Sequence, residues 1–100
     1  MPFSALLIAN RGEIAVRIAR GAADLGLRTV AIYSSDDAQS LHVRVADEAY
    51  AMPGSGAAAY LDMDAVIGAA KATGCDAIHP GYGFLSERAD FARRSAEEGL

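Results

Sequence analysis

Short apolar runs alternate along this chain with longer segments in which apolar residues recur every three to four positions. The first run covers residues 5–9, and a second covers residues 29–33. Runs of this length, bounded by turn residues, are typical of strands that are buried on both faces. Between them, residues 13–25 show the periodicity of an amphipathic helix that ends at Gly26. We therefore predict a β–α–β unit with parallel strands and a right-handed crossover.

The predicted helix has an apolar side and a charged side. Its apolar stripe consists of Ile14, Ile18, Ala22 and Leu25, widened by Ala15 and Ala19. Its charged stripe consists of Glu13, Arg17, Arg20 and Asp24. The charged residues form two i,i+4 pairs, each worth about 0.3 kcal/mol on an exposed helix. A solvated face is the favoured interpretation, although Val16 and Ala23 beside the charges leave room for contact with a partner subunit.

The remainder of the chain continues the alternation. We predict a polar loop at 34–37, a short helix at 39–45, a strand at 47–52 and a flexible loop at 53–56. A helix follows, from an Asp62 cap to Gly74, and then a third strand of the main sheet at 75–79. The last predicted elements are a shaped loop at 80–87 and a helix at 88–98, with Ser86 as its N-cap and Gly99 at its end. This order indicates an α/β fold with a Rossmann-like parallel sheet and flanking helices. Because another strand is due at Leu100, we expect residues 1–100 to be a domain that is incomplete at its C-terminus, with a complete small domain as the alternative.

Composition narrows the class of protein further. With 100 residues and 52% hydrophobic residues, the chain can bury one core and is not disordered. A net charge of −4 provides no basic surface for nucleic acid or anionic lipid, so we expect neither as a partner. The single cysteine, Cys75, excludes an internal disulfide and fits a reducing compartment. We see no basic leader and no run long enough to span a membrane, and so expect a cytoplasmic protein.

The first predicted turn, Asn10-Arg11-Gly12-Glu13, stands where a dinucleotide-binding protein carries Gly-x-Gly-x-x-Gly. Side chains on three of these four residues would crowd a pyrophosphate, and Glu13 would repel a phosphate at the helix N-terminus. NAD or FAD binding is therefore disfavoured. Arg11 either orients a neighbouring loop or an acidic ligand, or is a surface or intersubunit arginine. The acidic loop at 34–37 could hold a ribose, but a turn with a helix cap is the favoured interpretation.

The segment that begins at His79 is the strongest candidate for a binding site. Ligands of open parallel sheets bind beyond the carboxyl ends of the strands, and residues 81–87 lie there with the ring and hydroxyl of Tyr82. His79 has no second histidine or cysteine at metal-ligand spacing, so we predict no metal site and favour a structural histidine over a catalytic one. Glu87 is best explained as a first-turn acid on its helix. Cys75 is interpreted as core packing, and no nucleophilic triad is present.

Two motifs resemble the N-terminal domain of biotin carboxylases. Residues 8–15 read Ile-Ala-Asn-Arg-Gly-Glu-Ile-Ala, and residues 79–87 read His-Pro-Gly-Tyr-Gly-Phe-Leu-Ser-Glu. They occur in the order and at the separation of that family, and residues 47–49 and 60–61 match it as well. The resemblance spans essentially the whole chain and implies the Rossmann-like domain that precedes an ATP-grasp domain.

The resemblance also implies an activity for a parent enzyme. That ligase would carboxylate N1 of biotin with bicarbonate and ATP, with Mg²⁺ or Mn²⁺, through carboxyphosphate. Biotin would sit on a lysine of a carrier domain, and a carboxyltransferase would pass the carboxyl group to an acyl-CoA, pyruvate or a similar acceptor. In that family the residues that hold ATP, metal and bicarbonate lie in later segments. The resemblance therefore implies no catalytic residue, no metal ligand and no bound cofactor within residues 1–100, and the isolated piece should be inactive.

The resemblance carries a few roles over to individual residues. Tyr82, Gly83 and Phe84 match the loop that flanks the biotin end of the active site, with His79 and Glu87 as its support. Arg20 and Asp24 match positions at a subunit interface in bacterial relatives, which implies a homodimer or larger oligomer; Asp24 is shorter than the glutamate frequent there. Two alternatives stay open: another ATP-grasp ligase, similar to carbamoyl-phosphate synthase, and a non-enzymatic Rossmann-like binding module.

Overall fold

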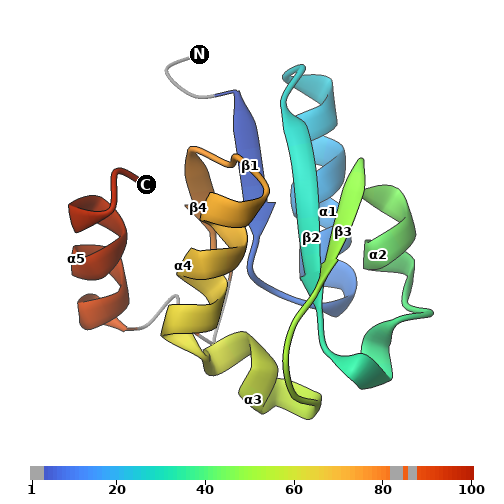
Figure 1. Ribbon diagram of the computed structural model, residues 1–100. Coiled ribbons are helices and arrows are strands. Elements are labelled where there is room, and N and C mark those ends of the chain that lie inside the picture. Colours follow the sequence, from blue (N-terminus) through green and yellow to red (C-terminus); the bar gives the residue numbers. More distant parts are fainter. Residues whose placement is uncertain (1–3, 82–84, 86–87) are drawn as a thin grey trace.

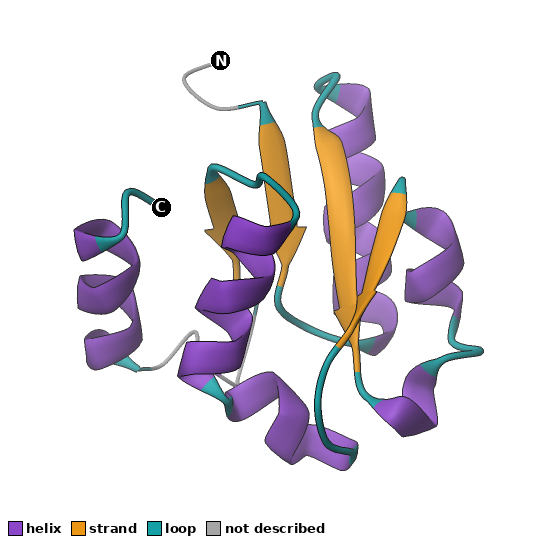
Figure 2. Ribbon diagram, in the orientation of Figure 1, coloured by secondary structure: helices purple, strands orange, loops and turns teal. Residues whose placement is uncertain are grey.

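The chain folds around one four-stranded parallel sheet with helices on both sides (Figures 1 and 2). The structure, a computed structural model, describes residues 4–81, 85 and 88–100. The strands are β1 (Ala5–Ile8), β2 (Arg28–Tyr33), β3 (Glu48–Ala51) and β4 (Ala77–His79). The helices are α1 (Gly12–Asp24), α2 (Leu41–Val45), α3 (Gly56–Leu61), α4 (Met63–Ala72) and α5 (Ala89–Glu97), with a 3-10 turn, η1 (Ser35–Asp37). The predicted Rossmann-like α/β class is confirmed.

Strand β1 occupies an interior position in the order β3-β2-β1-β4. The chain builds β2 and β3 on one side of β1 and then crosses to its other side to form β4. Leu6 of β1 pairs with Thr29 of β2 and with Ala77 of β4. The order reverses at β1, and open parallel sheets bind ligands beyond the carboxyl ends of the strands at such a reversal. The segments that follow β1 and β4 therefore lie where a site is expected.

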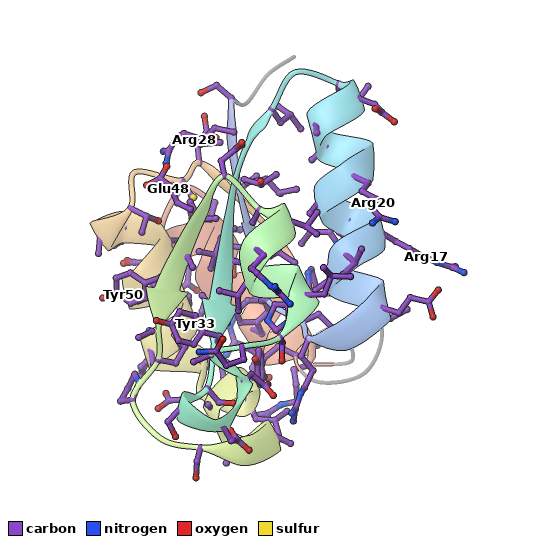
Figure 3. The ribbon with its side chains drawn as sticks, turned by 90° about the vertical axis from the view of Figure 1, so that its right-hand side faces the viewer. Arg17, Arg20, Arg28, Tyr33, Glu48 and Tyr50 are labelled. Atoms are coloured by element: carbon purple, nitrogen blue, oxygen red, sulfur yellow. The ribbon has the colours of Figure 1, made fainter. Side chains whose placement is uncertain are left out.

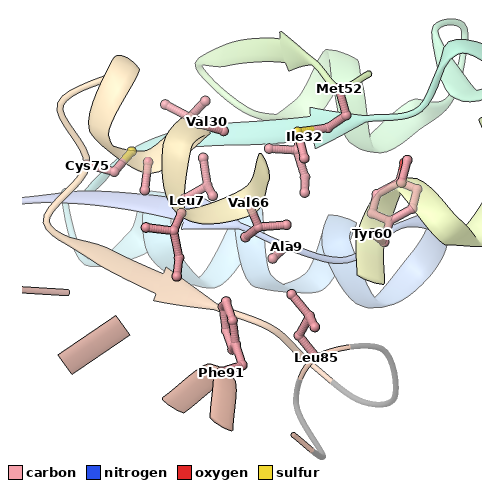
Figure 4. Close-up of a cluster of buried hydrophobic side chains, with 14 of the residues drawn as sticks. Leu7, Ala9, Val30, Ile32, Met52, Tyr60, Val66, Cys75, Leu85 and Phe91 are labelled. Atoms are coloured by element: carbon pink, nitrogen blue, oxygen red, sulfur yellow. The ribbon is translucent and has the colours of Figure 1, made fainter. Parts of the chain in front are cut away.

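Alternate residues of β1 are buried in two different layers of the core. Leu7 lies in the larger cluster, which β1 and β2 share with α3, α4 and Phe91 of α5 (Figure 4). Leu6 and Ile8 point the other way and pack beneath α1. A strand buried on both faces needs apolar side chains at every position. The short apolar run therefore predicted this strand correctly.

Helix α1 meets the sheet through small side chains. Its buried residues are Ala15, Val16, Ala19 and Ala22. The three alanines confirm part of the predicted stripe, and they allow the helix to approach the sheet closely. Leu25 contradicts the prediction, since it is 62% exposed. Val16 is buried and not part of an outer surface, because α2 packs against α1.

The charged side of α1 is exposed as predicted (Figure 3). Arg17 lies 3.4 Å from Glu13, so the first i,i+4 pair forms. Arg20 and Asp24 are both exposed, but they do not form an ion pair within the described residues. The outward direction of Arg17 and Arg20 is visible in Figure 3.

Several boundaries differ from the prediction for local reasons. Helix α3 was missed, because its six residues, three of them alanine, show too little periodicity to predict a helix. Asp62 is confirmed as the cap of α4, where its carboxylate accepts a hydrogen bond from Ala65 N at 3.1 Å. The N-cap position of α5 is Arg88, so the prediction of Ser86 is wrong. Strand β3 joins the same sheet beside β2, which makes β4 the fourth strand of the sheet and not the third.

Candidate functional site

The side chain of Asn10 joins the end of β1 to the segment that follows β4. Its Nδ2 donates to the carbonyl of Pro80 at 2.7 Å, and its Oδ1 accepts from Arg11 N at 2.8 Å. The backbone of Ala9 donates to His79 O at 3.0 Å immediately beside this contact. Asn10 is 2% exposed. The first turn and the start of the 79–87 motif, 70 residues apart in sequence, are therefore one junction.

The junction requires a glycine at position 81. Its φ of +69° lies in the left-handed region, which L side chains rarely adopt. A Cβ at this position would lie 2.6 Å from Asn10 Nδ2 and 2.8 Å from Ile14 Cγ2. The Gly81 N–H donates to His79 Nδ1 at 3.1 Å. His79 thus contacts the segment after β4, as expected of a structural histidine.

Arg11 is held by an acidic residue from the end of β2. Its Nη2 lies 2.5 Å from Asp37 Oδ1, and its guanidinium lies 5.5 Å from the centre of the Tyr60 ring. The Tyr60 hydroxyl donates to Asp37 Oδ2 at 2.8 Å and accepts from Ser34 N at 3.3 Å. Asp37 is 6% exposed and Tyr60 is fully buried. Of the roles considered for Arg11, the geometry matches the orientation of a neighbouring loop.

Burial sets the protonation of the Tyr60 phenol. Removal from water raises the pKa of Tyr60 to about 12, and the hydrogen bond to Asp37 acts in the same direction. The phenol therefore remains a neutral donor to the carboxylate across the physiological range. Arg11, Asp37 and Tyr60 come from the ends of β1 and β2 and from α3, so this trio fastens three elements at one edge of the sheet.

The second carboxylate of the acidic loop, that of the exposed Asp36, is also hydrogen-bonded within the protein. Asp36 Oδ1 lies 2.6 Å from Ser34 Oγ and accepts from Gly56 N at 2.9 Å. These two hydrogen bonds, that of the Ser34 hydroxyl above all, lower the pKa of Asp36. The loop at 34–37 is thus a turn that anchors the start of α3. Both of its carboxylates have hydrogen-bond partners within the protein, which matches the predicted turn.

The geometry of the first turn also argues against phosphate binding. Gly12 lies at the start of α1 with a φ of +66°, and the exposed Glu13 carboxylate follows it. The Arg11 N–H is already used by Asn10. A phosphate cradle needs free backbone N–H groups and no negative charge beside them. The turn is therefore a structural junction in the described chain.

His42 is a buried histidine that sequence reasoning missed. It is 1% exposed, and its Nε2 lies 3.2 Å from the carbonyl of Ile32. Its Nδ1 has no hydrogen-bond partner among the described residues. Burial lowers the pKa of His42, so the ring is neutral at neutral pH and donates from Nε2. The short helix predicted at 39–45 gave no sign that His42 would be in the core.

Two shallow cavities adjoin one another along α1. One has a volume of about 310 Å³ and an apolar lining that includes Leu6, Ile18 and Leu25. The other, of about 420 Å³, includes Ile14, Ile18 and Gly81. His79 and Arg17 border both. Together the two cavities form an apolar groove between α1 and β4.

Other predicted site residues lie away from the junction or outside the described part. Arg20 and Asp24 are exposed on α1. Tyr82, Gly83, Phe84 and Glu87 lie outside the described residues, so their predicted roles stay predictions. Within residues 4–81, 85 and 88–100, no three histidine, cysteine or acidic side chains gather as metal ligands. In the same part of the chain no helix is both long and apolar enough to cross a membrane.

The partners of Arg11 were also missed from sequence. Asp37 and Tyr60 are 23 residues apart, and no local pattern relates them. One signal was available: a tyrosine inside an alanine-rich segment is large enough to be buried, and a buried hydroxyl requires a partner. An aspartate at the carboxyl edge of the same sheet was the natural candidate.

The fold and the junction define a class: a Rossmann-like α/β domain whose first turn contacts the segments that follow β2 and β4. Residues 2–100 match the family described as "Biotin carboxylase, N-terminal domain". The chain belongs to this family.

Individual relatives agree with the family. The chain is 58% identical over 98 residues to a pyruvate carboxylase of Staphylococcus aureus. That match covers 95% of this chain and 8% of the pyruvate carboxylase. It is 59% identical, with a TM-score of 0.95, to the biotin carboxylase domain of a single-chain bacterial carboxylase, covering 97% of this chain and 23% of the other. It is 45% identical, also with a TM-score of 0.95, to the biotin carboxylase domain dimer of the Hydrogenobacter thermophilus 2-oxoglutarate carboxylase, which was solved with MgADP, ADP and bicarbonate. That match covers 98% of this chain and 22% of the other chain. The chain thus spans less than a quarter of each of these relatives.

Proposed function

We propose that this chain is the N-terminal part of a biotin carboxylase, the ligase that carboxylates biotin with ATP and bicarbonate in a biotin-dependent carboxylase. The observation that carries the proposal is the match of residues 2–100 to the N-terminal domain of that family. The structural match to biotin carboxylase domains at TM-scores of 0.95 supports it. In the parent the chain would wall one side of the active site and support assembly.

We propose that the described residues bind no nucleotide of their own. The polar groups of the first turn and of the acidic loop are bonded to one another, and Glu13 stands at the helix N-terminus. We therefore propose that ATP, its Mg²⁺ or Mn²⁺ and bicarbonate are held by an ATP-grasp domain in later segments of the parent. The dimeric relative solved with MgADP and bicarbonate is consistent with this division, since the present chain matches 22% of it.

The proposal extends to partners and to the biotin side of the site. The parent would work with a biotin carrier domain and a carboxyltransferase, on the same chain or on other subunits. Tyr82, Gly83 and Phe84 would flank the biotin, with His79 and Glu87 as support. Arg20 and Asp24 would face a second subunit, for which their exposure on α1 leaves room.

The test is ADP release by the intact parent polypeptide. We expect release to rise when free biotin is added together with bicarbonate, and the 100-residue chain assayed alone to be silent. A parent that is indifferent to biotin would contradict the proposal and favour another ATP-grasp ligase. Activity in the 100-residue chain would contradict the claim that the chemistry lies in later segments.

A second experiment separates the proposal from a stand-alone binding module. Titration of the 100-residue chain with NAD, ATP and ADP should give no saturable binding at micromolar concentrations. Saturable binding that is lost on substitution within residues 10–13 would favour the module.

A further inference from the structure

We propose that Asn10 is a positioning residue for the loop that begins at Gly81, and that it acts through this loop on the affinity for biotin. The inference rests on the proposed function. It assigns a role to a buried side chain that does not itself touch substrate.

The hydrogen bonds of Asn10 require a carboxamide. Nδ2 donates to Pro80 O at 2.7 Å, while Oδ1 accepts from Arg11 N at 2.8 Å. A carboxylate supplies acceptors only, and a hydroxyl is too short to bridge both groups. At 2% exposure water cannot substitute for either bond. An amide at residue 10 is therefore needed to hold both backbone groups at once.

The same side chain also sets the path of Gly81. Its Nδ2 and Ile14 Cγ2 fill the space that a Cβ of residue 81 would need. Strand β4 is three residues long and pairs with β1 alone among the described strands, and the Asn10 contact lies directly after it. Residue 82 is bonded directly to Gly81. A shift of the Asn10 contact is therefore transmitted to the start of the loop that we propose flanks biotin.

Asn10→Asp is the sharpest test, because it changes one atom and no volume. The carboxylate keeps the acceptor for Arg11 N and places a second oxygen against Pro80 O, where the two repel each other. Protonation of the new carboxyl group restores a donor. The variant should therefore recover as the pH falls, and a recovery confined to the KM for biotin separates a local effect on the loop from a general loss of stability.

The measurement uses ADP release by the intact parent, with free biotin and ATP varied in turn. We expect Asn10→Asp to raise the KM for biotin about tenfold, which is the size of effect expected from the loss of one buried hydrogen bond. The KM for ATP should stay unchanged. The ratio of variant to wild-type KM for biotin should narrow between pH 8 and pH 6. Asn10→Ser, which has no carboxylate and cannot reach Pro80, should show the same split without the pH dependence.

A matched control lies at the other end of the same strand pair. The Asp76 carboxylate accepts from the N–H groups of Ser4 and Ala5, so it joins β1 to β4 as Asn10 does. Asp76→Asn is the reverse single-atom exchange and leaves Pro80 and Gly81 untouched. We expect it to leave the KM for biotin at the wild-type value.

The outcomes separate this inference from the proposed function. Suppose that the wild-type parent responds to biotin. If Asn10→Asp and Asn10→Ser then raise the KM for biotin and the KM for ATP equally, or change neither, Asn10 serves the fold alone and the inference is wrong. An equal rise in Asp76→Asn would also overturn it, since loosening the strand pair anywhere would then suffice. A wild-type parent without any response to biotin would remove the proposed function and this inference together.

Discussion

The two ends of the sheet are fastened by polar contacts of different kinds. At the carboxyl edge, Asn10, Asp37 and Tyr60 are buried and bonded to groups from other elements. At the amino edge, Arg28 and Glu48 form an ion pair in contact with water, visible at one end of β2 and β3 (Figure 3). Asp76 joins β1 to β4 there and is likewise exposed.

The difference determines what each edge can tolerate. A buried polar group must keep its partners, because losing one leaves the other without either protein or water. An exposed group regains water when its partner is removed, so exposed ion pairs contribute little. The buried contacts of Asn10, Asp37 and Tyr60 are therefore specific in their residues, whereas the exposed Arg28–Glu48 pair is replaceable.

The largest expected effect is that of Asp37→Ala at the carboxyl edge. The substitution removes the partner of the Arg11 guanidinium and of the Tyr60 hydroxyl together, and should lower the free energy of unfolding by about 3–5 kcal/mol. Urea denaturation of the chain, followed by circular dichroism, measures it. Glu48→Ala at the amino edge is the control and should cost far less; equal losses would remove the distinction between the two edges.

The second effect compares two glycines with similar backbones. Gly81 and Gly26 have φ of +69° and +76°, but a Cβ would meet Asn10 and Ile14 at the first position and open space at the second. Gly26→Ala should cost about 1 kcal/mol of backbone strain. Gly81→Ala should cost roughly 2 kcal/mol more, because the junction must move. Similar midpoints in urea for the two variants would show that the junction yields freely.

The third effect is that of Tyr60→Phe, expected at about 1.5 kcal/mol for the lost hydrogen bond to Asp37. It has a pH signature. The folded pKa of about 12 lies above the unfolded value of 10, so the contribution is complete below pH 10 and is lost as the pH rises toward 12. The unfolding free energy of the wild type should fall in that window more steeply than that of the variant. Parallel profiles would contradict this account of the phenol.

The smallest effect concerns His42, whose pKa is lowered by burial. The unfolded chain binds a proton at this residue more readily than the folded chain, so stability is complete above pH 6.5 and falls as the pH drops below it. His42→Gln can donate to the Ile32 carbonyl but cannot take up a proton. We expect its unfolding free energy to depend less on pH between 6.5 and 5. An unchanged slope would show that His42 stays neutral or is solvated on protonation.

Local sequence patterns predicted most of the fold but little of the junction between the first turn and the segment after β4. The apolar runs at 5–9 and 29–33 predicted β1 and β2, because a strand that is buried on both faces needs apolar residues at consecutive positions. Asp62 was recognised as a cap because its partner, Ala65, is three residues away.

What the sequence could not show depends on distant partners. Asn10 meets Pro80, and Asp37 meets Tyr60, only after the sheet has assembled. Leu25 follows the helical period yet is exposed, because no described element covers that end of α1. The resemblance located both halves of the junction, residues 10–13 and 79–81, without revealing that they touch.

The position of β1 between β2 and β4 has a consequence for synthesis on the ribosome. Leu6 can pair with Thr29 soon after both have been translated, but Ala77 follows much later. Ala77 follows Thr29 by 48 residues, so at ordinary translation speeds the delay is roughly 2–10 s. Throughout that interval the β4-facing edge of β1, with its apolar residues, is open to the wrong strand or to a chaperone. Pairing of β4 then covers this edge of β1, and β4 becomes the edge strand on that side of the sheet.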